Sequence, residues 1–132
     1  MKTSKDLCIF CNKTNCKIVN SFKYFFIIRD TAYPVTEHHT LIIANRHVSD
    51  YFDLKKEEII ELNEILNDQK KELQQLDNKI TGFNVGVNIG KDAGQSIMHC
   101  HVHLIPRRKG DVEDPRGGVR GVIPSKQKYE RK

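Results

Sequence analysis

The segment that decides the fold is Met98-His99-Cys100-His101-Val102-His103-Leu104-Ile105-Pro106, in which histidines alternate with apolar residues. Side chains along a β-strand point alternately to the two faces of its sheet. The segment therefore predicts a strand over residues 97–105, ended by Pro106, with the apolar side chains toward the core. The three imidazoles then form a row on the opposite face, roughly 7 Å from one to the next.

Such a row of imidazoles suits metal binding, covalent catalysis at phosphorus by the central histidine, or a pH switch. A set of plain surface histidines is the remaining alternative. The upstream turn, Gly94-Gln95-Ser96, offers backbone N–H groups, an amide and a hydroxyl, which suit phosphate oxygens. The same turn region offers only Asp92 as a carboxylate for a metal. These features favour phosphorus chemistry over a metal at the row.

The rest of the chain predicts four further elements. Aromatic and β-branched residues over 22–28 and 40–44 predict two strands paired as a hairpin. Apolar residues spaced by three, four and seven over 54–79 predict one long helix. Alternation over 83–89 predicts another strand, with Asn88 on its polar face. The length of 132 residues predicts a single domain, in which the polar stretch 1–21 is a loop-rich lead-in.

The net charge of +5 has an uneven distribution. Residues 1–105 carry 13 Lys/Arg and 13 Asp/Glu, whereas residues 106–132 carry nine Lys/Arg against four Asp/Glu. All of the excess positive charge therefore lies in a basic C-terminal segment, which indicates an anionic partner. Nucleic acid is a weak candidate, because the segment lacks interleaved aromatic residues and any known nucleic-acid-binding motif.

Composition and cysteine usage set the broad class. A hydrophobic fraction of 38% and a charged fraction of 30% fit a globular protein and exclude a disordered chain. No stretch approaches the roughly 18 apolar residues of a membrane helix, and residues 1–6 lack the apolar run of a signal peptide. We therefore expect a cytoplasmic protein with no membrane partner and with its four cysteines reduced.

The histidine segment resembles the signature of the histidine-triad (HIT) family, which stands here as residues 99–105. The resemblance extends from about Cys8 to Pro124 and includes Tyr33-Pro34-Val35-Thr36, residues 39–43 and Arg46-His47. Residues 109–124 are similar to the bacterial diadenosine-polyphosphate-hydrolase-like branch. The family implies an α+β fold with an antiparallel sheet of about five strands, one long helix and a short N-terminal segment, usually in a homodimer.

The resemblance also implies an activity, which is hydrolysis of a dinucleoside polyphosphate at its α-phosphate through a nucleotidyl-histidine intermediate. Diadenosine tri- or tetraphosphate is the expected type of substrate. A nucleoside phosphoramidase or adenylyl-conjugate hydrolase, and a non-catalytic nucleotide-binding protein, are the alternatives. His103 at the third triad position, where transferases of the superfamily carry Gln, favours hydrolysis. The absence of Trp argues against the phosphoramidase branch.

The family pattern assigns roles to individual residues. His101 matches the nucleophile, His103 the donor to a phosphate or leaving-group oxygen, and His99 and His39 the histidines that support the triad. The expected substrate contacts are Asp30 to the ribose hydroxyls, Ile28 or Phe26 in the base pocket, Asn88 near the scissile phosphate, and Gln95 and Ser96 in the phosphate-binding turn. Two departures affect this region: Asp30 lies nine residues before His39 instead of about eight, and Glu37-His38 replaces a frequent Pro-Gly.

Several bacterial members of the family bind a structural zinc, and the four matching ligands here are Cys8, Cys11, His47 and His99. Two thiolates and two imidazoles form a tetrahedral zinc set. Buried free thiols and a surface His47 are the plain alternatives. Zinc would attach the lead-in, residues 1–21, to the histidine strand.

The basic segment, residues 106–132, follows directly from the histidine strand. We therefore expect some of its cations to face the distal phosphates of the substrate. The candidates are Arg107, Arg116, Arg120 and Lys126.

Overall fold

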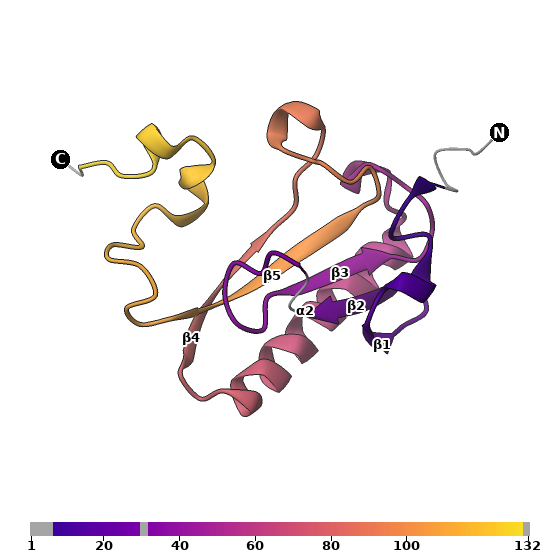
Figure 1. Ribbon diagram of the computed structural model, residues 1–132, viewed down its shortest axis with the longest axis horizontal. Coiled ribbons are helices and arrows are strands. Elements are labelled where there is room, and N and C mark those ends of the chain that lie inside the picture. The colour runs from indigo at the N-terminus through magenta and orange to yellow at the C-terminus, as the bar shows by residue number, and fades with distance from the viewer. Residues whose placement is uncertain (1–6, 30–31, 131–132) are drawn as a thin grey trace.

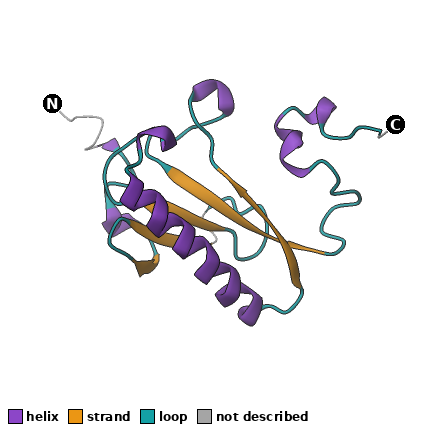
Figure 2. Cartoon of the chain, turned by 180° about the vertical axis from the view of Figure 1, so that it is seen from behind, coloured by secondary structure: helices purple, strands orange, loops and turns teal. Residues whose placement is uncertain are grey.

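The fold is a five-stranded antiparallel sheet with one long helix across it (Figures 1 and 2). The computed structural model describes residues 7–29 and 32–130. The strands are β1 (Ile18–Ser21), β2 (Phe25–Arg29), β3 (Thr40–Ala44), β4 (Ile80–Gly86) and β5 (His101–Arg108), and the long helix is α2 (Lys56–Leu76). Their order across the sheet is β1-β2-β3-β5-β4. The expected α+β fold with about five strands and one helix is confirmed.

The helix covers one face of the sheet, as Figure 2 shows. Leu62 and Ile65 of α2 belong to one buried cluster with Ile27, Ile42 and Val102 from the three central strands. Leu62, Ile65, Leu66 and Leu73 follow one another at spacings that place their side chains on one face of an α-helix. No helix within residues 7–29 and 32–130 combines the length and apolar character needed to cross a membrane.

The opposite face carries the histidines. His101 pairs with Ile43, and His103 with Leu41, and directly opposed residues of antiparallel strands project to the same face. Phe10 of the lead-in packs on this face in a second buried cluster that includes Leu41 and Ile43. The histidine face is therefore partly covered by the lead-in and partly open.

The histidine strand begins later and ends later than expected, because it runs from His101 to Arg108 instead of over 97–105. Pro106 is tolerated inside it because β3 stops at Thr40, opposite Leu104, so that no strand faces the missing N–H of Pro106 on that side. His99 lies before the strand, and its side chain leaves the predicted row of three.

Three other boundaries differ from expectation. The helix covers 56–76 instead of 54–79, because the N–H of the C-cap residue Asp77 closes its last turn on the carbonyl of Leu73. Strand β4 covers 80–86 instead of 83–89, which places Asn88 beyond its end. The lead-in is not all loop, since β1 pairs with β2 at the edge of the sheet.

The segment after β5 lies apart from the helix, beyond the β4–β5 end of the sheet (yellow in Figure 1). It contains two short 3₁₀ turns, η4 (Gly118–Val122) and η5 (Pro124–Lys126). Three more such turns, η1 (Lys13–Asn15), η2 (Tyr51–Asp53) and η3 (Lys91–Ala93), lie in loops.

Candidate active site and metal centre

The backbone fixes which ring nitrogen of His101 carries the proton. Its Nδ1 lies 2.8 Å from the carbonyl oxygen of His99, and a carbonyl only accepts, so Nδ1 carries the proton and donates. The lone pair is therefore on Nε2. Burial is the main influence on this imidazole and lowers its pKa. A neutral imidazole with a free lone pair on Nε2 is the form that attacks an electrophile.

His103 is held in the complementary state by a chain of hydrogen bonds. The N–H of Val35 donates to Nδ1 of His39 at 3.0 Å, so the proton of this imidazole is on Nε2. Nε2 of His39 lies 2.9 Å from Nδ1 of His103 and donates to it. His103 therefore carries its own proton on Nε2, as a hydrogen-bond donor.

Electrostatics keep the His103 imidazole neutral, so that it carries a single proton. Burial lowers the pKa of His103 to about 4, and the neighbouring His101 and His39 contribute in the same direction. The rings of His101 and His103 lie side by side, with centroids 5.4 Å apart. The structure thus brings a lone pair on one imidazole next to an N–H donor on the other. The catalytic roles of these histidines stay predictions.

Phe10 is a neighbour of the triad that the sequence analysis missed. Its ring packs edge-on against His101 at 5.1 Å and against His99 at 5.9 Å between centroids. Phe10 lies between Cys8 and Cys11, so its sequence position within C-x-x-C was the available signal. Its side chain is only 4% exposed and limits the freedom of the His101 ring.

The four residues predicted as metal ligands converge. The donor atoms of Cys8, Cys11, His47 and His99 all lie within 4.8 Å of one another. Nδ1 of His99 lies 3.2 Å from Nδ1 of His47 and 3.4 Å from Sγ of Cys8, and Sγ of Cys11 lies 3.1 Å from Nδ1 of His47. A tetrahedral zinc with the usual bond lengths requires N···N edges of about 3.3 Å and N···S edges of about 3.5 Å. The donor set therefore fits zinc.

His99 connects this cluster to the candidate nucleophile. Its Nε2 donates to the carbonyl of Ala44 at 2.6 Å, which leaves the lone pair of Nδ1 for the cluster. Its own carbonyl accepts from His101. His99 thus supports the triad through its backbone, while its imidazole lies in the metal set.

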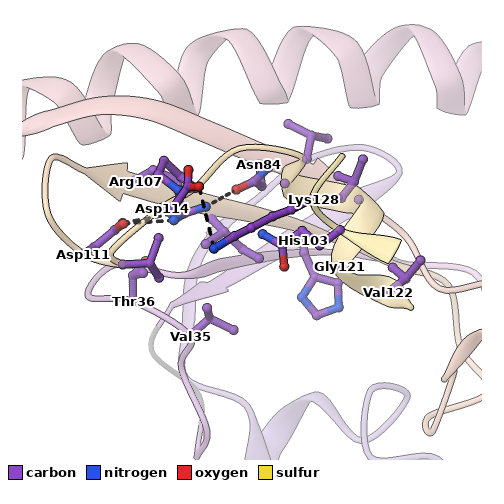
Figure 3. Close-up of a pocket in the computed structure, with 18 of the residues that line it drawn as sticks. Val35, Thr36, Asn84, His103, Arg107, Asp111, Asp114, Gly121, Val122 and Lys128 are labelled. Carbon is purple, nitrogen blue, oxygen red and sulfur yellow. Dashed lines mark hydrogen bonds and ion pairs between the residues drawn. The ribbon is translucent and has the colours of Figure 1, made fainter. Parts of the chain in front are cut away.

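A cavity of about 800 Å³ opens beside His103, between β4, β5 and the C-terminal segment (Figure 3). Its lining includes Asn88, as predicted for a substrate contact, and also Asn84. Figure 3 shows Arg107 held between Asn84 and Asp111.

The other predicted substrate contacts are placed as follows. Asp30 lies outside the described residues. Ile28 and Phe26 are buried in the cluster around Phe10. Gln95 is buried, and its amide is engaged with backbone: Oε1 accepts from the N–H of Gly90, and Nε2 donates to the carbonyls of Ser49 and Ile97. Ser96 is exposed on the same turn. Gln95 therefore holds the turn together, and Ser96 remains accessible.

Of the four tail cations expected near the substrate, Arg107 lies at this cavity. Within the described chain, the cavity lining includes Arg107 and Lys128 but not Arg116, Arg120 or Lys126. Arg116 contacts Asp114 at 3.4 Å, and Arg120 donates to backbone carbonyls at the chain end. These guanidinium groups contact residues of the tail itself, and an approach of Arg116 or Arg120 to the distal phosphates stays a prediction.

The comparisons with known proteins agree with this geometry. The chain is 37% identical over 81 residues to the nitrilase and fragile histidine triad fusion protein NitFhit of Caenorhabditis elegans, and covers 18% of it. It is 34% identical over 84 residues to a bis(5'-nucleosyl)-tetraphosphatase of Schizosaccharomyces pombe, and covers 44% of it. It is 37% identical over 83 residues to an AP-4-A phosphorylase of Mycobacterium tuberculosis, and covers 41% of it. Each of these matches spans 61% of this chain and less than half of the relative's own length.

Solved structures resemble the whole sheet and helix. A Zn-bound histidine triad family protein of Mycobacterium smegmatis superposes with a TM-score of 0.74 at 27% identity, over 83% of this chain and 81% of that one. A HIT family protein of Bacillus anthracis gives 0.72 at 32% identity, over 80% and 77%. A diadenosine triphosphate hydrolase of Plasmodium falciparum gives 0.67 at 31% identity, over 74% and 65%. The model of the HIT domain matches residues 12–110, three quarters of the chain, so this chain belongs to the HIT family.

Proposed function

We propose that this protein hydrolyses a dinucleoside polyphosphate at its α-phosphate, with Nε2 of His101 as the nucleophile. The observation that carries the proposal is the pair of opposite tautomers on β5. His101 presents a lone pair because its Nδ1–H is bound to a carbonyl, and His103 presents an N–H because its Nδ1 accepts from His39. Attack on phosphorus with stabilisation of the leaving oxygen needs both.

In the first step, Nε2 of His101 bonds to the α-phosphorus and the bond from phosphorus to the bridging oxygen breaks. The Nε2–H of His103 donates a hydrogen bond to that oxygen and stays on His103. The rest of the substrate leaves as a nucleoside polyphosphate anion, which needs no proton at neutral pH. The His101 ring that carries the nucleotidyl group has a positive charge, because its Nδ1 keeps the proton that it donates to the carbonyl of His99.

In the second step, water attacks the same phosphorus and the P–N bond breaks. The electron pair of that bond returns to Nε2 of His101, and the water loses a proton to solvent. The products are a mononucleotide and the regenerated neutral imidazole. The backbone bond to His99 holds the ring in place through both steps.

The choice of substrate class rests on the leaving group and on the relatives. A neutral His103 with a pKa of about 4 is a hydrogen-bond donor and holds no proton to spare, which suits an anionic leaving group better than the amine of a phosphoramidate. Three similar proteins are named as a tetraphosphatase, an AP-4-A phosphorylase and a diadenosine triphosphate hydrolase. Their shared substrate class supports a dinucleoside polyphosphate here. Hydrolysis of a phosphoramidate or an adenylyl conjugate remains the second candidate.

We also propose a structural zinc on Cys8, Cys11, His47 and His99, supported by the convergence of their donor atoms. When bound, zinc crosslinks the lead-in to the residue before β5. We further propose a cytoplasmic homodimer, which sedimentation of the purified protein tests. A single 15 kDa species at micromolar concentration would rule the dimer out.

The decisive experiment offers diadenosine tri- and tetraphosphate and adenosine phosphoramidate to the wild type and to His101→Ala in ¹⁸O water. We expect turnover of the polyphosphates by the wild type alone, with one ¹⁸O atom on the mononucleotide from the attacked α-phosphate. A labelled nucleotide on His101 after a denaturing quench at alkaline pH, where the P–N bond survives, would identify the intermediate. Equal turnover by both proteins would refute the role of His101, and binding without turnover would favour the non-catalytic alternative.

A further inference from the structure

A hydroxyl of the loop between β2 and β3 bonds to the backbone of the histidine strand. Oγ1 of Thr36 donates to the carbonyl oxygen of Pro106 at 2.8 Å. Pro106 is fully buried, and β3 ends opposite Leu104, so this carbonyl lies past the point where a neighbouring strand supplies an N–H. A buried carbonyl needs a donor, and the Thr36 hydroxyl is that donor.

The attached loop closes around the imidazole of His39. The N–H of His39 donates to the carbonyl of Thr36 at 3.1 Å, and the N–H of Val35 donates to Nδ1 of His39 at 3.0 Å. The second of these bonds decides which nitrogen of His39 carries the proton, and His39 in turn decides the same for His103. Val35, Thr36 and His103 all line the cavity drawn in Figure 3.

Burial contributes little to holding this loop. The side chain of Tyr33 is 91% exposed and that of Val35 is 66% exposed, so apolar packing does not fix the position of the Val35 N–H. His38 has a φ of 71°, a left-handed conformation that non-glycine residues rarely adopt. The described part of the loop therefore depends on specific hydrogen bonds. They include that of Thr36, one from Arg108 to the carbonyl of Glu37 and one from the Thr40 hydroxyl to the carbonyl of His38.

We propose that Thr36 is a positioning residue of the reaction: its hydroxyl holds the loop on β5 so that the Val35 N–H sets the tautomer of His39 and, through it, the Nε2–H tautomer of His103. Its effect on turnover rests on the proposed function. Its effect on the tautomer does not, because that follows from the hydrogen bonds alone.

The test compares Thr36→Val, which keeps the shape and removes the hydroxyl, with Thr36→Ser, which keeps the hydroxyl. Two-bond ¹H–¹⁵N correlation spectra of histidine-labelled protein report which ring nitrogen is protonated, with His103→Asn to assign the signals. We expect His103 to be the Nε2–H tautomer in the wild type and in Thr36→Ser, and a mixture of both tautomers in Thr36→Val.

In the kinetic arm, kcat on the polyphosphate falls at least about tenfold in Thr36→Val while KM stays within about twofold, since donor catalysis is lost and substrate contacts are not. Thr36→Ser restores kcat. A rise in KM alone would make Thr36 a substrate contact and overturn the proposal. If Thr36→Val does not fold by circular dichroism, Thr36→Ala, which admits water to the Pro106 carbonyl, takes its place.

An unchanged His103 spectrum in folded Thr36→Val overturns the proposal. This holds even if the melting temperature falls, because a loss of stability without a change of tautomer would indicate a purely structural role for Thr36. Absence of turnover by the wild type would instead defeat the proposed function, and the spectra would still decide the role of Thr36.

Discussion

Replacing Phe10 with alanine tests whether the lead-in is an integral part of the active-site face. The ring is 4% exposed and contacts the imidazoles of both His99 and His101. A buried phenylalanine removes roughly 150–200 Å² from water, worth about 4–5 kcal/mol at about 25 cal/mol per Å². Alanine retains a small part of this, so we expect Phe10→Ala to lower the free energy of unfolding by about 3–4 kcal/mol, within the usual range for such truncations.

The assay is urea unfolding of zinc-saturated protein, followed by far-UV circular dichroism. With a slope of about 1.5 kcal/mol per molar urea, the midpoint falls by about 2 M. Phe52→Ala is the matched control, because the same side chain is 76% exposed there and its removal shifts the free energy of unfolding by no more than about 0.5 kcal/mol. The catalytic rate of Phe10→Ala should also fall, because the His101 ring loses the neighbour that limits its rotation.

Equal midpoints for the two alanine variants would show that Phe10 is not packed on the sheet and would refute this account of the lead-in. A large loss of stability with full retention of turnover would support the packing of Phe10 on the sheet. It would refute the prediction that Phe10 affects catalysis through the His101 ring.

Three further predictions concern acid, metal and the Gln95 turn. The pKa of His103 is about 4 in the folded chain against an ordinary 6.5, so between these values the unfolded chain binds a proton that the folded chain does not. The melting temperature should therefore fall as the pH is lowered from 6.5 to 4. His103→Asn should make this fall of the melting temperature smaller, and an identical slope would contradict the assignment. Metal analysis should find one zinc per chain in the wild type and in Cys16→Ser, whose thiol lies outside the cluster, but not in His47→Ala; full zinc in His47→Ala would exclude the proposed ligand set. Gln95→Ala removes the hydrogen bonds from this buried amide to the backbone of Gly90, Ser49 and Ile97 and should lower the free energy of unfolding by about 1–3 kcal/mol. The exposed Ser96→Ala should keep the stability and raise KM. The reverse pattern would show that Gln95 binds phosphate directly.

Much of the fold could be predicted from local pattern. The alternation in 98–106 marked the histidine strand, and the spacing of leucines and isoleucines marked the helix, because both signals depend only on which face of an element is buried. Element ends were less predictable, because they depend on neighbours. Strand β5 continues through Pro106 only because β3 has already ended at Thr40.

Among the site residues, the histidines and the zinc set were recognisable because their residue types and spacing carry the chemistry. For the tail, the net charge could not show which of its cations lies at the cavity: Arg107 lines it, whereas Arg116 and Arg120 contact the tail itself. Phe10 was missed because its position within C-x-x-C shows only that it lies near the predicted metal ligands, and its packing against His101 is formed by the fold.

The sequence by itself determined the family, the candidate nucleophile and the candidate metal ligands, since these depend on side-chain identity. Only the tertiary structure decided which nitrogen of each imidazole holds the proton. That choice belongs to the partners that folding brings close: the His99 carbonyl for His101, and for His103 the neighbouring His39, itself set by the Val35 N–H. An isolated neutral histidine can carry its proton on either ring nitrogen, and a hydrogen bond made across the fold selects one of the two tautomers.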